Sequence, residues 1–163
     1  MKRLLATILT MIIMVMSAQA QIVTSAEVKN EVAKILEKSY KNLTSGDIQV
    51  KIIATPFAEL SLPDGKITYK IVQGGEKIIP RDIKRVDVYV NNAFIKTLNL
   101  PAQTSVFKEV LVASDYINRE QAINKETTTI KKIDVSLRAD YVLTENVLDK
   151  EMSAKKAFQK GEV

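Results

Sequence analysis

The stretch that decides the fold is EVLVASDYINREQAI, residues 109–123. It starts as a short apolar strand at 110–113, passes through a tight polar turn and ends in a second apolar segment. A fainter copy closes the chain, because INREQA at 117–122 aligns with FQKGEV at 158–163. In both copies an apolar residue is followed by an amide, a basic residue, a turn position and a polar residue. Six aligned positions do not by themselves establish a repeat.

The N-terminus has the three parts of a secretory signal peptide. Lys2 and Arg3 are followed by the uncharged apolar run LLATILTMIIMVM, residues 4–16, and by the A-x-A site at 18–20. A transmembrane anchor is the alternative, but a run of 13 residues is short for a hydrocarbon core of about 30 Å. We therefore expect residues 1–20 to be removed between Ala20 and Gln21, and the chain to be exported without stable membrane insertion.

Composition excludes several classes of protein. Without Lys2 and Arg3 the chain has 22 basic and 19 acidic residues, so its net charge is +3. These charges alternate in sign and form no basic stripe with aromatics, which argues against nucleic-acid binding. The chain has neither His nor Cys, which removes the usual nucleophile systems, zinc sites and disulfides. We expect a hydrophobic core to stabilise the fold.

A helix is predicted at the start of the exported chain. Residues 24–27, TSAE, have the form of a capping box with Thr24 as the N-cap and Glu27 as its reciprocal partner. The apolar residues that follow recur at helical spacing: Val28, Val32, Ile35, Leu36, Tyr40 and Leu43. Gly46 is expected to end the helix in a left-handed conformation.

Strands are predicted beyond this helix, because the apolar period changes to two. Residues 48–52 and 67–71 alternate apolar and polar side chains, and PDG at 63–65 provides a turn between them. Residues 86–90 alternate likewise, and Asn91-Asn92 predicts a two-residue hairpin with a return strand to about 100. Pro101 is expected to end that strand.

Further short elements are predicted in the second half, and together they define the fold class. Strands are expected at 106–113 and 127–135, a short helix at 141–148 and a last short strand at 153–158. The fold class is therefore α+β, mostly β: a helix packed on a small antiparallel sheet, then antiparallel ribbons. We expect a boundary near 100–105, with an N-terminal domain at 21–104 and a second domain at 105–163.

Catalytic chemistry has little support in the sequence. Two carboxylate pairs could in principle act as acid and base, Asp115 with Glu120 and Asp134 with Asp140. Nothing around them indicates the apolar setting that such a pair requires, so we interpret them as solvated and expect no enzyme. The apolar helix face either packs on the sheet or binds a client, and free strand edges offer a second binding device.

The second half resembles the SAF domain, a β-clip module, of the flagellar P-ring formation protein family FlgA. In that family a strand ending in V-x-V-A leads to "apolar-x-basic-Gly-polar-x-apolar". VLVA at 110–113 and INREQAI at 117–123 match this pattern, with Glu120 where the family has Gly. AKKAFQKGE at 154–162 matches the second turn, and there Gly161 is present. If the turn requires positive φ, Glu120 is strained where glycine would not be.

The resemblance implies a non-catalytic chaperone of the periplasm. Such a protein would bind the flagellar P-ring subunit non-covalently, without a cofactor, while the ring assembles around the rod. Candidates for client contact are Asn91, Asn92, Tyr116, Arg119 and Glu120. Family members continue for several tens of residues past the second turn, so we expect the SAF domain to be incomplete at Val163.

Two other functions remain open for a chain with this module. Pilus-assembly proteins that resemble CpaB also carry SAF domains, and a membrane-retained N-terminus would favour that structural role. Sialic acid synthases carry SAF-like domains as well, although no catalytic domain precedes the module here. The sequence leaves the oligomeric state undetermined.

Overall fold

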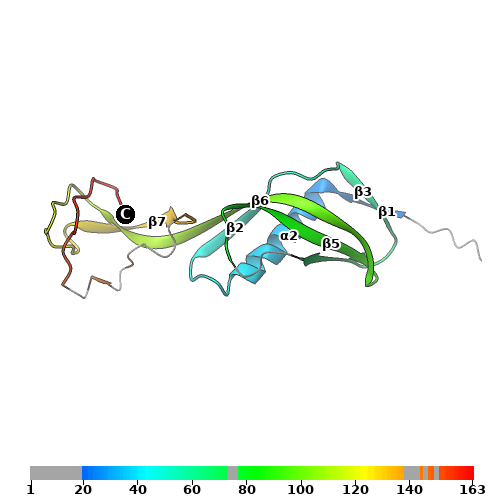
Figure 1. Cartoon of the computed structure of the whole chain (residues 1–163), viewed down its shortest axis with the longest axis horizontal. Coiled ribbons are helices and arrows are strands. Elements are labelled where there is room, and N and C mark those ends of the chain that lie inside the picture. Colours follow the sequence, from blue (N-terminus) through cyan, green and yellow to red (C-terminus); the bar gives the residue numbers. More distant parts are fainter. Residues whose placement is uncertain (1–19, 73–76, 138–143, 145–146, 149–150) are drawn as a thin grey trace, which may run out of the picture.

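The computed structural model describes residues 20–72, 77–137, 144, 147–148 and 151–163. Within them the chain forms two lobes along one elongated axis, joined by the long strand β6 (Figure 1). The N-terminal lobe holds the helix and most strands, and the C-terminal lobe holds the end of β6 with everything after it. The predicted class, α+β and mostly β with the helix packed on an antiparallel sheet, is confirmed.

The elements follow one another as β1 (Ala20–Thr24), α2 (Ser25–Tyr40), β2 (Asp47–Ile52), β3 (Glu59–Pro63), β4 (Ile67–Ile71), β5 (Arg81–Val90), β6 (Ala93–Ala113) and β7 (Thr128–Asp134). The main sheet is antiparallel in the order β2-β6-β5-β4, and β7 pairs with the far end of β6. Strands β1 and β3 form a separate antiparallel ribbon. This ribbon was not predicted, because its partners lie about forty residues apart in the chain.

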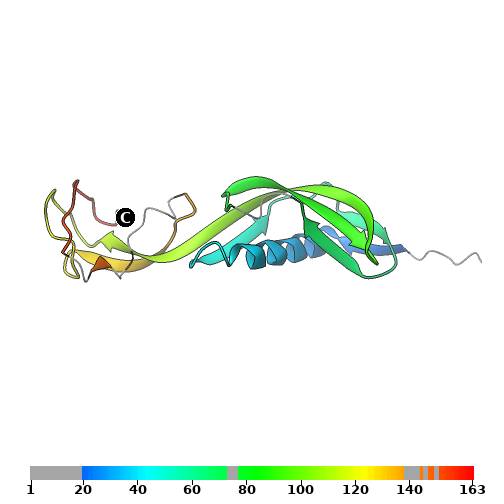
Figure 2. The ribbon, with the colours of Figure 1, turned by 60° about the horizontal axis from the view of Figure 1, so that its bottom comes forward.

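The helix begins at the predicted capping box. The Thr24 hydroxyl accepts a hydrogen bond from the Glu27 N–H, and the Thr24 N–H donates to the Glu27 carboxylate at 2.7 Å. The Thr24 N–H and the Thr24 hydroxyl both donate to the Glu27 carboxylate, and these two bonds lower the pKa of Glu27. The buried face is Val28, Val32, Leu36 and Tyr40, which pack on the sheet as predicted (Figure 2).

Removing the cap is expected to destabilise the protein moderately. Thr24→Ala leaves the first-turn N–H groups without their acceptor, and the free energy of unfolding should fall by about 1 kcal/mol. Urea denaturation followed by circular dichroism measures this change. Thr24→Ser keeps the hydroxyl and should behave like the parent chain; an equal loss in both variants would show that the hydroxyl is not the cause.

The end of the helix differs from the prediction. The last helical residue is Tyr40 and the C-cap Lys41 keeps right-handed dihedral angles, so Gly46 does not end the helix. Leu43 lies beyond the helix and is 44% exposed, which corrects its assignment to the buried face. Gly46 instead lies against β6, where a Cβ atom would come within 2.8 Å of the Phe107 carbonyl oxygen. Its role is close approach between two backbone segments.

The hairpin between β5 and β6 is confirmed. Asn91 and Asn92 both have positive φ, 49° and 67°, as a type I′ turn requires. The Asn91 side chain also holds the neighbouring turn, since its Oδ1 accepts from the Lys66 N–H at 2.9 Å. Gly65 lies so close that a Cβ there would meet the Asn91 side chain at 2.2 Å.

Strand β6 continues through Pro101, so the prediction that Pro101 ends it is wrong. The proline carbonyl accepts from the Ile53 N–H at 2.8 Å, one residue past the end of β2. The missing donor therefore falls at the last rung of the β2–β6 ladder, where Pro is tolerated. The Ile53 carbonyl accepts instead from Lys29 Nζ at 3.5 Å.

Three clusters of buried side chains lie along the molecule. The largest fills the N-terminal lobe between the helix and the sheet and ends on β6 at Ala102. The second surrounds Val106, Val110 and Val112 on β6 together with Val135, and the third contains Ala113, Ile117 and Ala154. The two expected domains, 21–104 and 105–163, stay a prediction.

The remaining predicted elements have mixed outcomes. The strand at 127–135 is confirmed as β7, whereas 153–158 forms two isolated bridges, Ser153 to Ala122 and Phe158 to Ile117, and no continuous strand. The predicted helix at 141–148 falls mostly outside the described residues, and so does most of the predicted signal peptide. No helix in the described ranges is both long and apolar enough to cross a membrane.

Candidate functional site

The two similar sequence segments at 117–122 and 158–163 pair with each other. Ile117 and Phe158, which occupy the same position in the two copies, exchange both backbone hydrogen bonds at 3.0 and 2.9 Å. Each turn is also held by an alanine that precedes the other turn. The Glu120 N–H donates to the Ala154 carbonyl at 2.6 Å, and the Gly161 N–H donates to the Ala113 carbonyl at 2.8 Å.

The internal bonds of the two turns are equivalent as well. The Gln121 N–H donates to the Asn118 carbonyl, and the Glu162 N–H donates to that of Gln159. The side chain at the fifth position accepts from the N–H at the second in both copies, at 2.8 and 3.0 Å. The two segments therefore form a clip in which each of these bonds in one half has its counterpart in the other.

The turn position has positive φ in both halves, 67° at Glu120 and 81° at Gly161. This confirms the strain expected from the glutamate, because a left-handed conformation disfavours any residue with a Cβ atom. The sequence pattern did not reveal the roles of Ala113 and Ala154. Their equal spacing, four residues before Ile117 and Phe158, was the available signal.

Removing the side chain at Glu120 and adding one at Gly161 are expected to change the free energy of unfolding in opposite directions. Glu120→Gly relieves the left-handed strain in the folded state. Glycine also increases the conformational entropy of the unfolded chain, which offsets part of this gain, so the free energy of unfolding should rise by about 0.5–1 kcal/mol. Gly161→Ala should lower it by about 1 kcal/mol. No heavy atom lies within 4 Å of a Cβ built on Gly161, so that loss reports backbone strain alone. Urea denaturation of the two variants tests both signs; a loss of stability in Glu120→Gly would contradict the assignment.

Three predicted contact residues lie on this clip. Tyr116 is 49% exposed, and the carboxylate of Asp115 accepts from its N–H at 2.8 Å. Arg119 and Glu120 are exposed and form a loose ion pair at 3.8 Å. All three project from the first half of the clip, where a partner could reach them.

The other two predicted contact residues are far from the clip. Asn91 and Asn92 form the tip of the β5–β6 hairpin at the opposite end of the elongated molecule (Figure 1). The structure therefore does not bring the five predicted residues together into one site. Asn91 also supports a turn through its side chain, so its substitution would disturb the fold. Ala20 and Gln21, at the predicted cleavage site, lie in the first rungs of β1.

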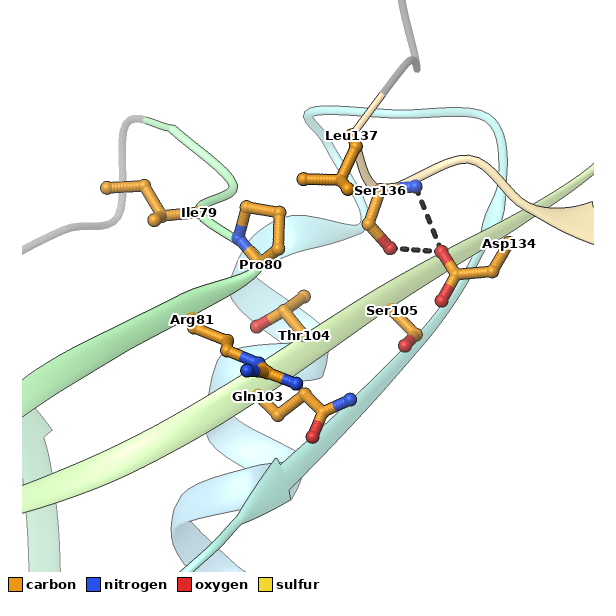
Figure 3. A pocket seen from close by; sticks show the side chains of 9 residues that line it. All are labelled: Ile79, Pro80, Arg81, Gln103, Thr104, Ser105, Asp134, Ser136 and Leu137. Carbon is orange, nitrogen blue, oxygen red and sulfur yellow. Dashed lines mark hydrogen bonds between the residues drawn. The ribbon is translucent and has the colours of Figure 1, made fainter.

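A pocket of about 730 Å³ lies where the lobes meet (Figure 3). Its floor is residues 103–105 of β6, and its walls are Ile79, Pro80 and Arg81 on one side and Asp134, Ser136 and Leu137 on the other. Asp134 accepts from the backbone N–H and the hydroxyl of Ser136. Burial alone would raise the pKa of Asp134, but these hydrogen bonds bring it below the usual value.

Thr104 lies in this pocket with an unsatisfied hydroxyl. The residue is 1% exposed, and its Oγ1 has no hydrogen-bond partner in the described part of the chain. Thr104→Val keeps the shape and removes the buried polar atom, so the free energy of unfolding should rise by about 1 kcal/mol. Thr104→Ser, which keeps the hydroxyl and loses the methyl group, is the control. A loss of stability in Thr104→Val measured by urea denaturation would show that the hydroxyl is satisfied.

The candidate carboxylates that the structure describes are each engaged with another group. Asp115 and Glu120 are exposed on the clip, and each has its own partner within two residues, the Tyr116 N–H and Arg119. Asp134 is engaged with Ser136, while Asp140 lies outside the described residues. Among the described residues no group of three or more acidic side chains could hold a metal ion. That the chain is not an enzyme stays a prediction.

Comparison with known proteins gives one structural match. No protein-family model and no curated protein matches the chain. Among solved structures, the monoclinic crystal structure of Salmonella FlgA in closed form is similar to it, with a TM-score of 0.43 and 11% sequence identity. The match covers 82% of this chain and 66% of that one, so the chain spans just under two thirds of the length of the FlgA structure.

Proposed function

We propose that this chain is a periplasmic assembly chaperone that binds the flagellar P-ring subunit non-covalently while the ring forms. The observation that carries the proposal is the clip. The two segments that resemble the FlgA family pattern are the two that pair, turn against turn, with equivalent hydrogen bonds. The residues of the pattern therefore form the paired turns, and the turn position has the positive φ that favours the glycine of the family pattern.

Complementation tests the proposal. A strain that lacks its P-ring formation protein receives the 163-residue chain, and its basal bodies are examined by electron microscopy. We expect P rings to reappear. The matched control is the chain without residues 2–20, which should remain in the cytoplasm and restore no rings.

Two results would separate the alternatives. If the full chain accumulates in the periplasm as folded protein and no P ring forms, the chaperone proposal is wrong. If the chain instead remains in the inner membrane and co-purifies with a pilus secretin complex, the structural role in pilus assembly replaces it.

A further inference from the structure

The N-terminal sheet has a face that no described element covers. The helix packs on one side of the sheet, and the opposite side, here called the outer face, is open (Figure 2). Its residues alternate with the buried ones along each strand. They are Lys51 and Ile53 at the end of β2; Lys70 and Val72 on and after β4; Arg81, Ile83, Arg85, Asp87 and Tyr89 on β5; and Phe94, Thr97, Asn99, Pro101 and Gln103 on β6.

Apolar side chains form a row across the middle of the outer face. Ile83 is paired with Pro101 in the β5–β6 register, and the Ile53 N–H donates to the Pro101 carbonyl. Ile83 is 62% exposed and Ile53 is 50% exposed. A solvated sheet face normally alternates to polar residues, so large exposed side chains in adjacent strands indicate an interaction site.

Aromatic side chains extend this surface toward the hairpin tip. The rings of Tyr89 and Phe94 meet edge to face at a centroid distance of 5.8 Å, and Lys70 Nζ lies 4.5 Å above the Tyr89 ring. Phe94 is 56% exposed. Paired aromatics of this kind are rigid, and they are enriched at the centres of protein interfaces.

The charges around these apolar side chains are mostly positive. The outer face carries four cations, Lys51, Lys70, Arg81 and Arg85, against one acid, Asp87. None of the four cations forms an ion pair within the described part of the chain, and Asp87 is occupied by the Thr97 hydroxyl at 2.6 Å. The outer face thus has an apolar centre and a cationic rim.

We infer that the outer face binds a protein surface in which apolar side chains are flanked by Asp or Glu carboxylates. This inference rests on the proposed function, and it assigns that surface to the P-ring subunit. β2 has six residues, β5 ten and β4 five; with the part of β6 that pairs with β5, and with strands about 4.8 Å apart, the outer face presents about 500 Å². That is more than half of the roughly 800 Å² that one partner contributes to a stable interface.

Binding of the purified P-ring subunit to the exported, purified chain, measured by isothermal titration calorimetry, tests the inference. Ile83→Glu and Arg85→Glu should each raise Kd at least tenfold. A matched control, Lys131→Glu on β7, should leave Kd within twofold. Affinity for the parent chain should fall between 50 and 500 mM NaCl, because the rim contacts are screened. Circular dichroism confirms that each variant is folded.

The outcomes separate the face from the function. If the parent chain binds the subunit and the outer-face variants bind equally well, the inference is overturned and the proposed function stands. If the parent chain does not bind the subunit, both fail. If client binding is unchanged while Ile83→Glu abolishes self-association in sedimentation, the outer face binds a second copy of the chain. If Ile83→Glu instead abolishes binding to phosphatidylglycerol vesicles, the outer face binds a membrane. Either result overturns the inference.

Discussion

Asp82→Ala is expected to lower the free energy of unfolding by about 3 kcal/mol, because it leaves a buried ammonium group without its counter-ion. Lys84 lies on the inward side of β5, and its side chain is 1% exposed. Its Nζ is 2.8 Å from Asp82 Oδ2 and 5.6 Å from the centroid of the Tyr40 ring. Asp82 itself is 31% exposed, which places the expected loss at the lower end for a broken buried pair.

A second substitution distinguishes a stranded charge from lost packing. Lys84→Met removes the charge and keeps most of the volume, so in the Asp82→Ala background it should restore at least half of the lost stability. Urea denaturation at pH 7 of the parent chain, the two single variants and the double variant provides the cycle. If the double variant is no more stable than Asp82→Ala alone, the burial of an unpaired ammonium is not the cause.

The same pair predicts a dependence on acid. The hydrogen bond from Lys84 holds the pKa of Asp82 below its usual value, despite the opposing effect of burial. A carboxyl group whose pKa is lowered in the folded state stabilises the protein above its unfolded pKa, about 3.9, and this contribution is lost as the pH falls through the folded pKa. The stability difference between the parent chain and Asp82→Ala should therefore be constant near neutral pH and shrink below about pH 4.

Gly46→Ala is expected to lower the free energy of unfolding by about 2 kcal/mol. The new Cβ would lie 2.8 Å from the Phe107 carbonyl oxygen and 2.8 Å from Val106 Cγ1. The backbone cannot easily yield there, because Phe107 is paired with Asp47 of β2 and with Asp134 of β7. Thermal and urea denaturation measure the loss. The neighbouring exposed Ser45 supplies the control, since Ser45→Ala should change stability by less than about 0.5 kcal/mol.

A change in Gly46→Ala no larger than in the control would mean that the 44–46 loop relaxes away from β6. The displacement caused by Gly46→Ala should also disturb the junction between the lobes. Next to Gly46, Asp47 at the start of β2 forms an ion pair with Lys132 of β7, so the first residue of β2 contacts a strand of the C-terminal lobe.

Local signals in the sequence predicted the local structure well. The capping box at Thr24, the Asn91-Asn92 hairpin and the strained turn at Glu120 each depend on residues within a few positions of one another, and each is confirmed. The alignment of 117–122 with 158–163 indicated two similar turns, and both turns place a left-handed residue at the same position, Glu120 and Gly161.

Features that depend on distant partners were missed. The residues near Pro101 predict the end of a strand, because nothing among them shows that its missing N–H donor falls at the last hydrogen-bonded position between β2 and β6. The local sequence predicts that Gly46 caps the helix. Glycine is required there because the backbone lies close to β6, about sixty residues later in the chain. The outer face could be read only after the strand register was known, because Ile53, Ile83 and Pro101 are neighbours only across strands.

Strand β6 joins the two lobes, and its alternation of inward and outward side chains continues from one lobe into the other. Its inward side chains follow one parity from Leu98 through Ala102 to Val106 and Val110, so a single alternation assigns the core side in the first two clusters, and from Val110 to Ala113 every residue is buried. Inserting or deleting one residue between 102 and 106 would turn the C-terminal core outward, while a change of two residues would preserve it. Natural length variation in this strand should therefore occur in steps of two.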